Sequence, residues 1–392
     1  MTPAARVAAA IGILDEIFAG APAERALTRW ARGSRFAGSK DRAAVRDHVF
    51  DALRCRSSFG WLGGGETGRA VMIGALRSQG LAPETLFTGE GHAPAPLSAA
   101  ERAALPDPSE MPRAVARDLP EWIWPLVQQA HGAAADGIAE ALRHRAPVFL
   151  RVNTRKQGIE AARENLLADN IETRPHPLAQ AALEVTANAR RVQASAAYRD
   201  GLVELQDVGS QALVEALPLP EGGRILDYCA GGGGKSLAMA ARVTAEFVAH
   251  DASAARMKDL PERAARAGVE IRRATGAELR AGRPFDLVLA DVPCSGTGAW
   301  RRSPDSKWRF DANALQDLVD VQAGILRSCR DLVSPGGGLA YATCSLLDQE
   351  NRQQIERFLS ENADWHEEKR LSLTPLDGGD GFFLSVLRRK TE

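Results

Sequence analysis

The sequence predicts an α/β fold: a Rossmann-like catalytic domain preceded by a small α/β module and an all-helical N-terminal domain. Three observations support this. From Arg224 onward, short apolar strands alternate with helices, which is typical of a doubly wound parallel sheet. The stretch DYCAGGGGKS (227–236) follows the first of these strands and opens a helix. Residues before about 145 carry helical patterns, and a chain of 392 residues has room for two or three domains.

The N-terminal domain is expected to span residues 1–145 and to consist of helices. The apolar positions of its first helix lie on one face, at Val7, Ile11, Leu14 and Phe18. Segments 41–54 and 119–132 indicate further helices. The stretch 91–112, rich in proline and alanine, indicates a loop or linker between them.

The small module is expected over 146–205, with strands at 147–153 and 202–207 and a helix at 158–170 between them. The catalytic domain is expected over 206–392. Its predicted strands are 224–229, 246–251, 270–275, 285–292 and 338–345. Its first two predicted helices are 235–243 and 252–268, the second broken or kinked near Pro261. In such sheets, ligands bind at the carboxyl ends of the strands.

Composition places the chain among ordinary soluble proteins. It is 45% hydrophobic and 25% charged, and it has no uninterrupted apolar run near the roughly 20 residues of a membrane span. The charged, amphipathic N-terminus predicts a helix and not a signal peptide, so we expect a cytoplasmic protein without membrane contact. The five cysteines form no C-x-x-C pair, and the histidines do not cluster near them, so we expect no metal site.

The glycine-rich stretch ends as a phosphate-binding P-loop does, in Gly234-Lys235-Ser236. A P-loop also requires a glycine at position 229, where this chain has Cys229. A nucleoside triphosphate is therefore disfavoured. Glycines before a helix still let backbone amides approach a ligand, and Asp251, at the end of the next strand, suits the hydroxyls of a ribose. These features fit S-adenosylmethionine and NAD equally well.

Two cysteines follow apolar strands of the same predicted sheet. Asp291 ends one strand with Cys294 in the loop after it, and Cys344 ends the next. A thiolate that adds to carbon 6 of cytosine makes carbon 5 nucleophilic toward a sulfonium methyl group. A second thiol or a base nearby assists release of the product, and Asp291 is placed to hydrogen-bond the cytosine edge. A dehydrogenase needs none of these groups.

Several motifs together resemble the Sun-type bacterial RNA cytosine-5 methyltransferases. They are PVFLRVNTRK, VELQDVGSQALVEAL, DYCAGGGGKS, ADVPCSGTGAWRRSPDSKWRF, GGGLAYATCSLLDQEN and DGFFLSVLRRK, and they span about residue 147 to the C-terminus. The helical N-terminal part is similar, more weakly, to the NusB-like domain of members that modify small-subunit ribosomal RNA. This resemblance implies an enzyme that uses S-adenosylmethionine to methylate cytosine in RNA, with 16S rRNA as the expected substrate.

The resemblance also implies roles for individual residues. Cys344 is the nucleophile and Cys294 assists release, because a T-C-S cysteine marks an RNA enzyme whereas DNA enzymes attack with the P-C cysteine. The implied S-adenosylmethionine site consists of Cys229, Ala230, Gly231, Gly232, Gly233, Gly234, Lys235, Asp251 and Asp291. The chain departs from the family pattern twice. Gly231 and Gly232 stand where Ala-Pro is usual, and Ala277, with Glu278 beside it, stands where an acid near the adenine is usual.

The stretch after the Cys294 motif combines cations with aromatic rings. Its cations are Arg301, Arg302, Lys307 and Arg309, interleaved with Trp300, Trp308 and Phe310. Cations suit phosphates and aromatic rings stack on unpaired bases, so we expect the cations to face RNA. Packing of Trp308 into a core is the alternative.

Other functions also fit the fold. One is a non-catalytic RNA-binding factor of ribosome assembly, which would need neither Cys294 nor Cys344. Another is methylation of tRNA instead of rRNA. A nucleotide-dependent enzyme is disfavoured by Cys229. We expect the protein to act as a monomer.

Overall fold

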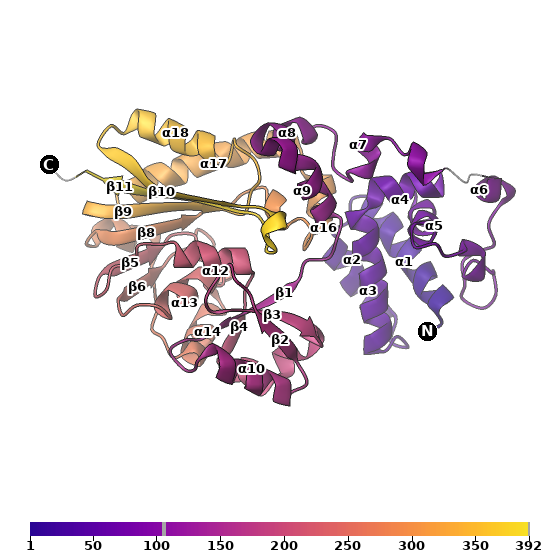
Figure 1. Ribbon diagram of the computed structural model, residues 1–392, viewed down its shortest axis with the longest axis horizontal. Coiled ribbons are helices and arrows are strands. Elements are labelled where there is room, and N and C mark those ends of the chain that lie inside the picture. Colours follow the sequence, from indigo (N-terminus) through magenta and orange to yellow (C-terminus); the bar gives the residue numbers. More distant parts are fainter. Residues whose placement is uncertain (104–106, 391–392) are drawn as a thin grey trace. The chain divides into compact units, whose positions relative to one another are not determined.

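A computed structural model describes residues 1–103 and 107–390. The chain divides into two compact units (Figure 1). Unit 1 contains Met1–Arg145 together with Trp300–Phe310, and unit 2 contains Ala146–Ala299 and Asp311–Glu392. Unit 1 therefore includes an eleven-residue segment from the middle of the C-terminal half of the chain. Among the described residues, no helix is long and apolar enough to cross a membrane.

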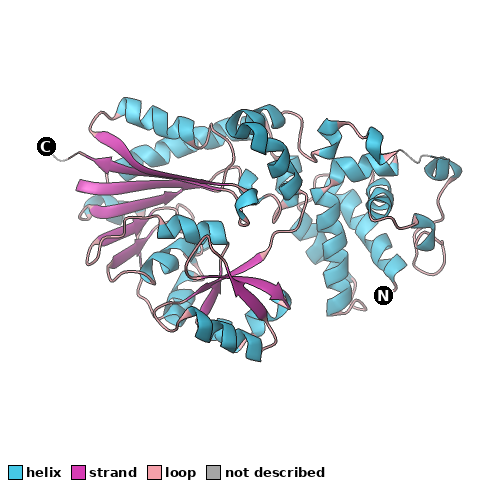
Figure 2. Ribbon diagram, in the orientation of Figure 1, coloured by secondary structure: helices cyan, strands magenta, loops and turns pink. Residues whose placement is uncertain are grey.

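Unit 1 is helical throughout its described residues (Figure 2). Its helices are α1 (Pro3–Phe18), α2 (Ala23–Gly33), α3 (Ser39–Arg54), α4 (Arg56–Gly63), α5 (Gly68–Ser78), α6 (Ala99–Ala103), α7 (Arg113–Ala116), α8 (Trp124–His131), α9 (Ala135–Leu142) and α16 (Pro304–Arg309). Helix α1 buries Val7 and Leu14 of the predicted face, but Ile11 and Phe18 stay half-buried. The predicted loop at 91–112 contains the short helix α6 and a turn at Pro108–Glu110, and residues 104–106 lie outside the described residues.

Glycines allow α4 and α5 to approach each other at backbone distance. A Cβ atom added to Gly63 would lie 1.8 Å from the carbonyl oxygen of Ala70. A Cβ added to Gly74 would lie 1.8 Å from the carbonyl oxygen of Phe59. Both distances are far below any van der Waals contact, and the two carbonyl oxygens belong to backbone that cannot rotate away. The packing of these two helices therefore depends on the absence of side chains at both positions.

Unit 2 begins with a small antiparallel sheet in the order β2-β3-β1-β4. Its strands are β1 (Val148–Val152), β2 (Glu172–Pro175), β3 (Ala182–Ala187) and β4 (Val203–Leu205), and its helices are α10 (Ile159–Ala168) and α11 (Ala196–Arg199). The sequence predicted β1, α10 and β4 but neither of the other two strands. Three of the four residues of the edge strand β2 are exposed, so it lacks the apolar alternation that marks a strand.

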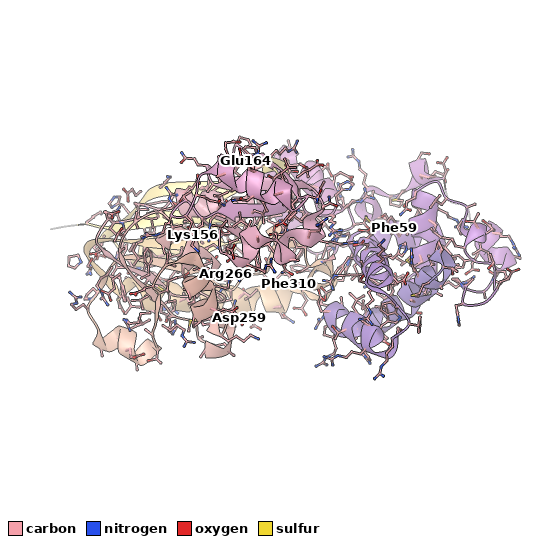
Figure 3. All side chains as sticks on the ribbon, turned by 90° about the horizontal axis from the view of Figure 1, so that it is seen from below. Phe59, Lys156, Glu164, Asp259, Arg266 and Phe310 are labelled. Atoms are coloured by element: carbon pink, nitrogen blue, oxygen red, sulfur yellow. The ribbon has the colours of Figure 1, made fainter. Side chains whose placement is uncertain are left out.

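A side chain from the small sheet region ties it to the rest of unit 2. Lys156, which follows β1, donates from Nζ to the carbonyl oxygens of Asp200 and Arg266, at 2.7 and 2.6 Å. Figure 3 labels Lys156 and Arg266 on this side of the molecule. Arg266 lies on α14 (Leu260–Ala267), which belongs to the helices that cover the larger sheet of this unit. The small sheet is therefore fixed to the part of the unit that contains the large sheet.

The large sheet has seven strands in the order β10-β11-β9-β8-β5-β6-β7. The strands are β5 (Arg224–Asp227), β6 (Glu246–Ala249), β7 (Arg272–Arg273), β8 (Phe285–Asp291), β9 (Val333–Thr343), β10 (Trp365–Leu373) and β11 (Phe382–Arg389). Strands β5 to β9 are parallel, as predicted. One edge carries two strands that the sequence analysis did not predict, where β11 pairs antiparallel with β9 and with β10. The connection between β10 and β11 is too short for the crossover that parallel pairing requires.

Helices cover both faces of this sheet (Figure 2). They are α12 (Val208–Glu215), α13 (Gly234–Ala240), α14 (Leu260–Ala267), α15 (Gly276–Ala281), α17 (Ala312–Arg330) and α18 (Arg352–Glu361). Along β8, Leu287 and Leu289 pack in one hydrophobic cluster with α12 and α13, while Val288 and Ala290 pack in another with α17 and α18. This alternation explains why the strand is a continuous apolar run. Pro261 lies in the first turn of α14 and starts that helix, so the predicted break is real.

We expect Gly74→Ala to lower the midpoint of thermal unfolding by several degrees, because the added methyl group cannot fit against the Phe59 carbonyl. Overpacking of this kind costs about 1–3 kcal/mol or more. Circular dichroism of the full chain measures the shift. The matched control is Gly12→Ala on α1, where a Cβ meets nothing within 4 Å. That change should raise the midpoint slightly, since alanine favours a helix by about 1 kcal/mol over glycine. Equal midpoints for the two variants would contradict the packing described here.

Candidate active site

The carboxyl ends of three neighbouring parallel strands form the site. Strand β8 lies between β5 and β9, and Asp291 at the end of β8 pairs with Ala342 of β9. Cys294 follows β8 by three residues, and Cys344 is the first residue after β9. The two sulfur atoms lie 3.4 Å apart. Parallel pairing thus brings together two thiols that are 50 residues apart in sequence.

The two thiols differ in what their surroundings do to them. A hydrogen bond with Cys344, followed by burial, raises the pKa of Cys294 well above its ordinary value. Cys294 is therefore protonated at neutral pH and can donate its S–H to the sulfur of Cys344. Cys229, in the glycine loop, also has a raised pKa, chiefly because it is buried and secondly because Asp227 is nearby. Neither Cys294 nor Cys229 is thus suited to be a thiolate in this environment.

A lysine and a carboxylate form an ion pair beside the thiols. Lys235 Nζ lies 2.6 Å from Asp291 Oδ2, and the two side chains are 11% and 30% exposed. Burial alone would lower the pKa of Lys235, but the charge of Asp291 and its hydrogen bond outweigh burial and raise it. Cys344 also raises the pKa of Lys235, so its sulfur and the lysine interact electrostatically. Lys235 is accordingly charged.

The glycine loop has a backbone that other residues cannot adopt. Gly231 and Gly233 have φ angles of +50° and +80°, a region that favours glycine. A Cβ on Gly233 would also lie 2.2 Å from a methyl carbon of Leu260. Arg151 of β1 donates to the carbonyl oxygen of Gly234 at 3.0 Å, and Arg263 donates to that of Gly232. The loop is therefore held from both the small sheet and α14.

Asp251, expected to bind a ribose, contacts the glycine loop in this structure. Its carboxylate accepts from the backbone amides of Gly231 at 3.0 Å and Ser253 at 2.9 Å. Arg256 lies 3.3 Å from the same carboxylate, with a side chain that is 60% exposed against 3% for Asp251. These contacts give Asp251 a second role, which is to shape the loop that follows β5.

Sequence reasoning gave no role to Asp227, the first residue of the glycine motif. It ends β5 and is 2% exposed. Its Oδ2 accepts from Ser236 Oγ at 2.6 Å, while its buried Oδ1 has no hydrogen-bond partner among the described residues. Burial raises the pKa of Asp227 to about 7. The sequence signal that could have identified Asp227 is a carboxylate at the carboxyl end of a buried strand, where ligands bind in such sheets.

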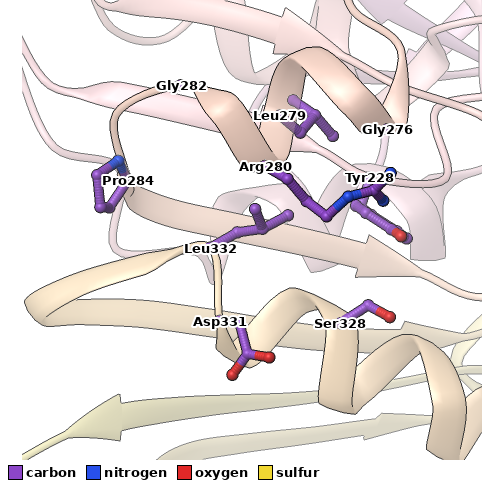
Figure 4. A pocket seen from close by; sticks show the side chains of 9 residues that line it. All are labelled: Tyr228, Gly276, Leu279, Arg280, Gly282, Pro284, Ser328, Asp331 and Leu332. Atoms are coloured by element: carbon purple, nitrogen blue, oxygen red, sulfur yellow. The ribbon is translucent and has the colours of Figure 1, made fainter.

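Glu278, which stands beside Ala277 at the expected adenine contact, has a structural role. Glu278 caps its own helix, α15, by accepting from the amide and hydroxyl of Thr275 at 2.7 and 2.8 Å. A cavity of about 310 Å³ lies between α15 and α17 (Figure 4). It is lined by Tyr228, Gly276, Leu279, Arg280, Gly282, Pro284, Ser328, Asp331 and Leu332. The two cysteines and the glycine loop are not part of this lining.

The expected RNA-facing cations divide into two groups. Arg302 and Arg309 are exposed, but Arg301 and Lys307 are only 5% and 1% exposed. Lys307 Nζ donates to the carbonyl oxygen of Arg54 at 2.8 Å, and burial lowers its pKa to about 8. The expectation that all four cations lie at the surface is therefore wrong for Arg301 and Lys307. Both belong to the segment that packs within unit 1.

Trp308 also packs within unit 1. Its Nε1 donates to the carbonyl oxygen of Leu53 at 2.6 Å, which fixes one edge of the indole on α3. Trp300 is 2% exposed, and the ring of Phe310 lies 5.7 Å from that of Trp122. The aromatic rings of this stretch thus attach the segment to the N-terminal helices, while Trp308 itself stays half-buried.

Comparison with known proteins finds two family models that match parts of the chain. A family model described as 16S rRNA methyltransferase RsmB/F matches residues 214–387. A second, described as the ferredoxin-like domain of RsmF/B-like methyltransferases, matches residues 119–193. Together they cover most of the chain beyond residue 118.

Curated relatives carry the same family name. The chain is 34% identical over 295 residues to "Ribosomal RNA small subunit methyltransferase B" of Pasteurella multocida, covering 69% of this chain and 65% of the relative. It is 34% identical over 286 residues to the protein of that name from Xylella fastidiosa, covering 68% and 66%. The matched part thus spans slightly less than two thirds of the length of these relatives.

Solved structures show the same fold. The crystal structure of PH0851 covers 99% of this chain with a TM-score of 0.76 and 19% identity. A methyltransferase homologue from Pyrococcus horikoshii covers 72% of the chain, and all of its own, with a TM-score of 0.62 and 22% identity. Both likenesses support the mixed α/β fold described above. By the family models and the curated relatives, the chain is similar over most of residues 119–387 to the RsmB/F family of 16S rRNA methyltransferases.

Proposed function

We propose that the protein methylates carbon 5 of a cytosine in RNA, with S-adenosylmethionine as methyl donor and 16S rRNA as substrate. One observation carries this proposal: the sulfur atoms of Cys294 and Cys344 lie 3.4 Å apart at the edge of the sheet. The Lys235–Asp291 ion pair lies at the same edge. Paired thiols beside a charged pair fit covalent activation of a pyrimidine, and the matched family supplies the class of substrate.

The residues at the edge of the sheet fit S-adenosylmethionine. The buried Oδ1 of Asp227 is an acceptor without a hydrogen-bond partner among the described residues, and an ammonium group would satisfy it. Backbone of the loop from Cys229 to Lys235 would hold the methionine part. Asp251, whose ion-pair partner Arg256 has an exposed side chain, would hold the ribose. When bound, this cofactor supplies an activated methyl group on a positively charged sulfur.

Cys344 acts as the nucleophile in this proposal. Its thiolate forms a bond to carbon 6 of cytosine, and the electron pair of the ring moves to make carbon 5 nucleophilic. Carbon 5 then takes the methyl group as the bond between that group and its sulfur breaks. The proton of carbon 5 leaves to water, the bond from Cys344 to carbon 6 breaks, and the thiolate is regenerated. The target base has to leave its stack for this attack.

Cys294 assists the last step. Because its raised pKa keeps it protonated, it donates a hydrogen bond to the sulfur that departs from carbon 6 and does not act as the base. Asp291 is placed to bind the cytosine edge, and its ion pair with Lys235 fixes the direction of its carboxylate. Each of these groups contacts the reacting base or the sulfur bound to it.

The first test is transfer of a labelled methyl group from S-adenosylmethionine to unmodified rRNA and tRNA, followed by bisulfite mapping. Label on 16S rRNA at one cytosine supports the proposal. Label on tRNA alone would show that tRNA, and not 16S rRNA, is the substrate. No label on either RNA, from a protein that binds the small subunit, would support the non-catalytic assembly factor.

We expect Cys344→Ala to lower methyl transfer by at least about 10³-fold, because the nucleophile is lost. S-adenosylmethionine affinity, measured by calorimetry, should change less than about threefold, since Cys344 does not hold the cofactor. The matched control is Cys55→Ala, which removes a buried thiol of unit 1. Full activity of Cys344→Ala would show that the nucleophile is wrongly assigned.

We expect Cys294→Ala to accumulate a covalent protein–RNA adduct, because attack by Cys344 survives while release is slowed. A species that stays shifted in a denaturing gel, and that disappears on protease treatment, measures the adduct. The double variant Cys294→Ala/Cys344→Ala should give no such species. If the single variant forms no adduct and turns over normally, Cys294 has no part in release.

The raised pKa of Asp227 makes a prediction about stability and pH. The folded protein holds this proton more tightly than the unfolded chain, whose pKa is near 3.8, so stability falls as pH rises from about 4 to about 7. Asp227→Asn removes this loss. Its thermal midpoint should therefore exceed that of the wild type by more at pH 8 than at pH 5.

The same variant tests the cofactor site. Loss of the carboxylate should weaken S-adenosylmethionine at pH 8 by about tenfold or more, since a hydrogen bond to a charged group is worth about 1.5–3 kcal/mol. Asp317→Asn, at an exposed aspartate of α17, serves as the control for both measurements. An Asp227→Asn variant with unchanged affinity would remove Asp227 from the proposed site.

A further inference from the structure

A buried carboxylate contacts both loops that carry the thiols. Glu350 lies between β9 and α18 and is 0% exposed. Its Oε1 accepts from the backbone amide of Ser295 at 2.8 Å and from Gln322 Nε2 at 3.0 Å. Its Oε2 accepts from Ser295 Oγ at 2.5 Å and from Ser345 Oγ. Four hydrogen bonds from described residues thus converge on one side chain.

The two serines are the direct neighbours of the two cysteines. Ser295 follows Cys294, and Ser345 follows Cys344. A single carboxylate therefore bridges two loops from separate strands at the positions next to the sulfur atoms. The loops also touch each other, through the serine hydroxyls at 3.2 Å and through a bond from the amide of Gly298 to the carbonyl oxygen of Cys344 at 3.0 Å.

Glu350 is itself held in place by β9. Tyr341 donates from its hydroxyl to the carbonyl oxygen of Glu350 at 2.6 Å. The next residue, Asn351, accepts from Thr343 Oγ1 at 2.5 Å and donates to the carbonyl oxygen of Ser345 at 2.8 Å. The turn that carries Glu350 is thus hydrogen-bonded to residues before and after Cys344. The carboxylate therefore has a fixed position, and the Cys294 loop binds to it.

Gln322 extends this arrangement to α17. Its side-chain amide donates to Glu350 and also to the carbonyl oxygen of Pro293, at 3.0 Å each. Pro293 precedes Cys294, as Ser295 follows it. The residues on both sides of Cys294 are therefore bound, one directly and one through Gln322, to the same carboxylate.

A carboxylate imposes one arrangement on its neighbours because it can only accept. The four donors are neutral groups: a backbone amide, a side-chain amide and two hydroxyls. Each must direct its hydrogen at Glu350, which leaves the oxygen of Ser345 to accept from the amide of Leu347, as it does at 3.0 Å. A buried charge is costly unless such bonds are all made, so loop arrangements that break them are strongly disfavoured.

We propose that Glu350 is a positioning residue that holds the Cys294 and Cys344 loops together and thereby sets the distance between their sulfur atoms. Its effect on catalysis rests on the proposed function, because it acts through the two thiols and touches neither substrate nor cofactor. The effect on the distance itself does not depend on any methyl transfer and can be measured without RNA.

Disulfide trapping with diamide tests the distance. The two thiols lose two protons and two electrons, the sulfur atoms join, and the reagent is reduced to a hydrazine. In the wild type, mass spectrometry should show rapid linkage of the peptides that contain Cys294 and Cys344. Glu350→Ala should slow this linkage by at least about tenfold. Glu350→Gln should recover much of the rate, since the amide keeps the size and the serine hydroxyls can turn to accept from it.

The control is Glu356→Gln, at a glutamate of α18 whose side chain is 56% exposed and pairs with Arg352. It should trap like the wild type. Circular dichroism and S-adenosylmethionine binding establish that each variant is folded. If Glu350→Ala does not fold, Ser345→Ala and Glu350→Gln each remove part of the network and should give intermediate rates. A folded Glu350→Ala that traps at the wild-type rate overturns the proposal, as does normal trapping by both of these milder variants.

Steady-state kinetics then separates positioning from simple loss of structure. Misplaced thiols should lower kcat for RNA by about 100-fold while KM stays within about threefold, and Glu350→Gln should recover part of the loss. An unfolded fraction would instead lower kcat in proportion to the lost cofactor binding. If the wild type transfers no methyl group to any RNA, the proposed function fails, while the trapping result still decides the role of Glu350.

Discussion

The parallel pairing of β8 with β9 is the constraint on which the site depends. Because both strands run in one direction, both loops that follow them lie at one edge of the sheet. A second backbone contact closes this edge, where the amide of Gly298 donates to Cys344 and the amide of Gly381 donates to Gly298. A Cβ on Gly298 would lie 2.4 Å from the carbonyl oxygen of Gly381. Three chain segments meet at Cys344, and side chains at the two glycines would push them apart.

The charges of the site are matched in a way that follows from this geometry. Lys235 reaches from the start of α13 to Asp291 at the end of β8, so the ion pair joins the glycine loop to the strand that carries one thiol. Asp227 ends the neighbouring strand β5 and holds its proton to about pH 7. The edge of the sheet therefore carries a neutral carboxyl group at Asp227 and a paired charge at Lys235 and Asp291, because a buried isolated charge would be costly. The raised pKa values of Lys235 and Cys294 depend on Asp291 and Cys344, which other parts of the chain supply, whereas that of Asp227 depends on burial.

Much of this arrangement could be predicted from the sequence because it follows from local patterns and one topological rule. Apolar strands, a glycine loop and strand-end positions placed both cysteines at one edge. The edge strand β10 was missed because six of its nine residues carry polar side chains, so it lacks the apolar pattern of a strand. The burial of Arg301 and Lys307 could not be predicted, because a sequence that mixes cations with aromatic residues has the same pattern whether it lies on a surface or packs against helices. Their burial depends on α3, about 250 positions earlier. Glu350 could not be assigned for the same reason: its four donors come from three separate parts of the chain.

The segment Trp300–Phe310 gives the chain an unusual connectivity. The chain leaves unit 2 after Ala299, contributes α16 to unit 1, and returns at Asp311. The two units are thus joined by three covalent passages instead of one, and neither is a continuous piece of sequence. A shortened chain that starts at Ala146 would deprive Trp300 and Lys307 of the helices that bury them. It would also loosen a stretch that begins only six positions after Cys294. Cutting between the units would therefore disturb the loop that carries Cys294, and the helical region is in that sense a structural part of the unit that contains both thiols.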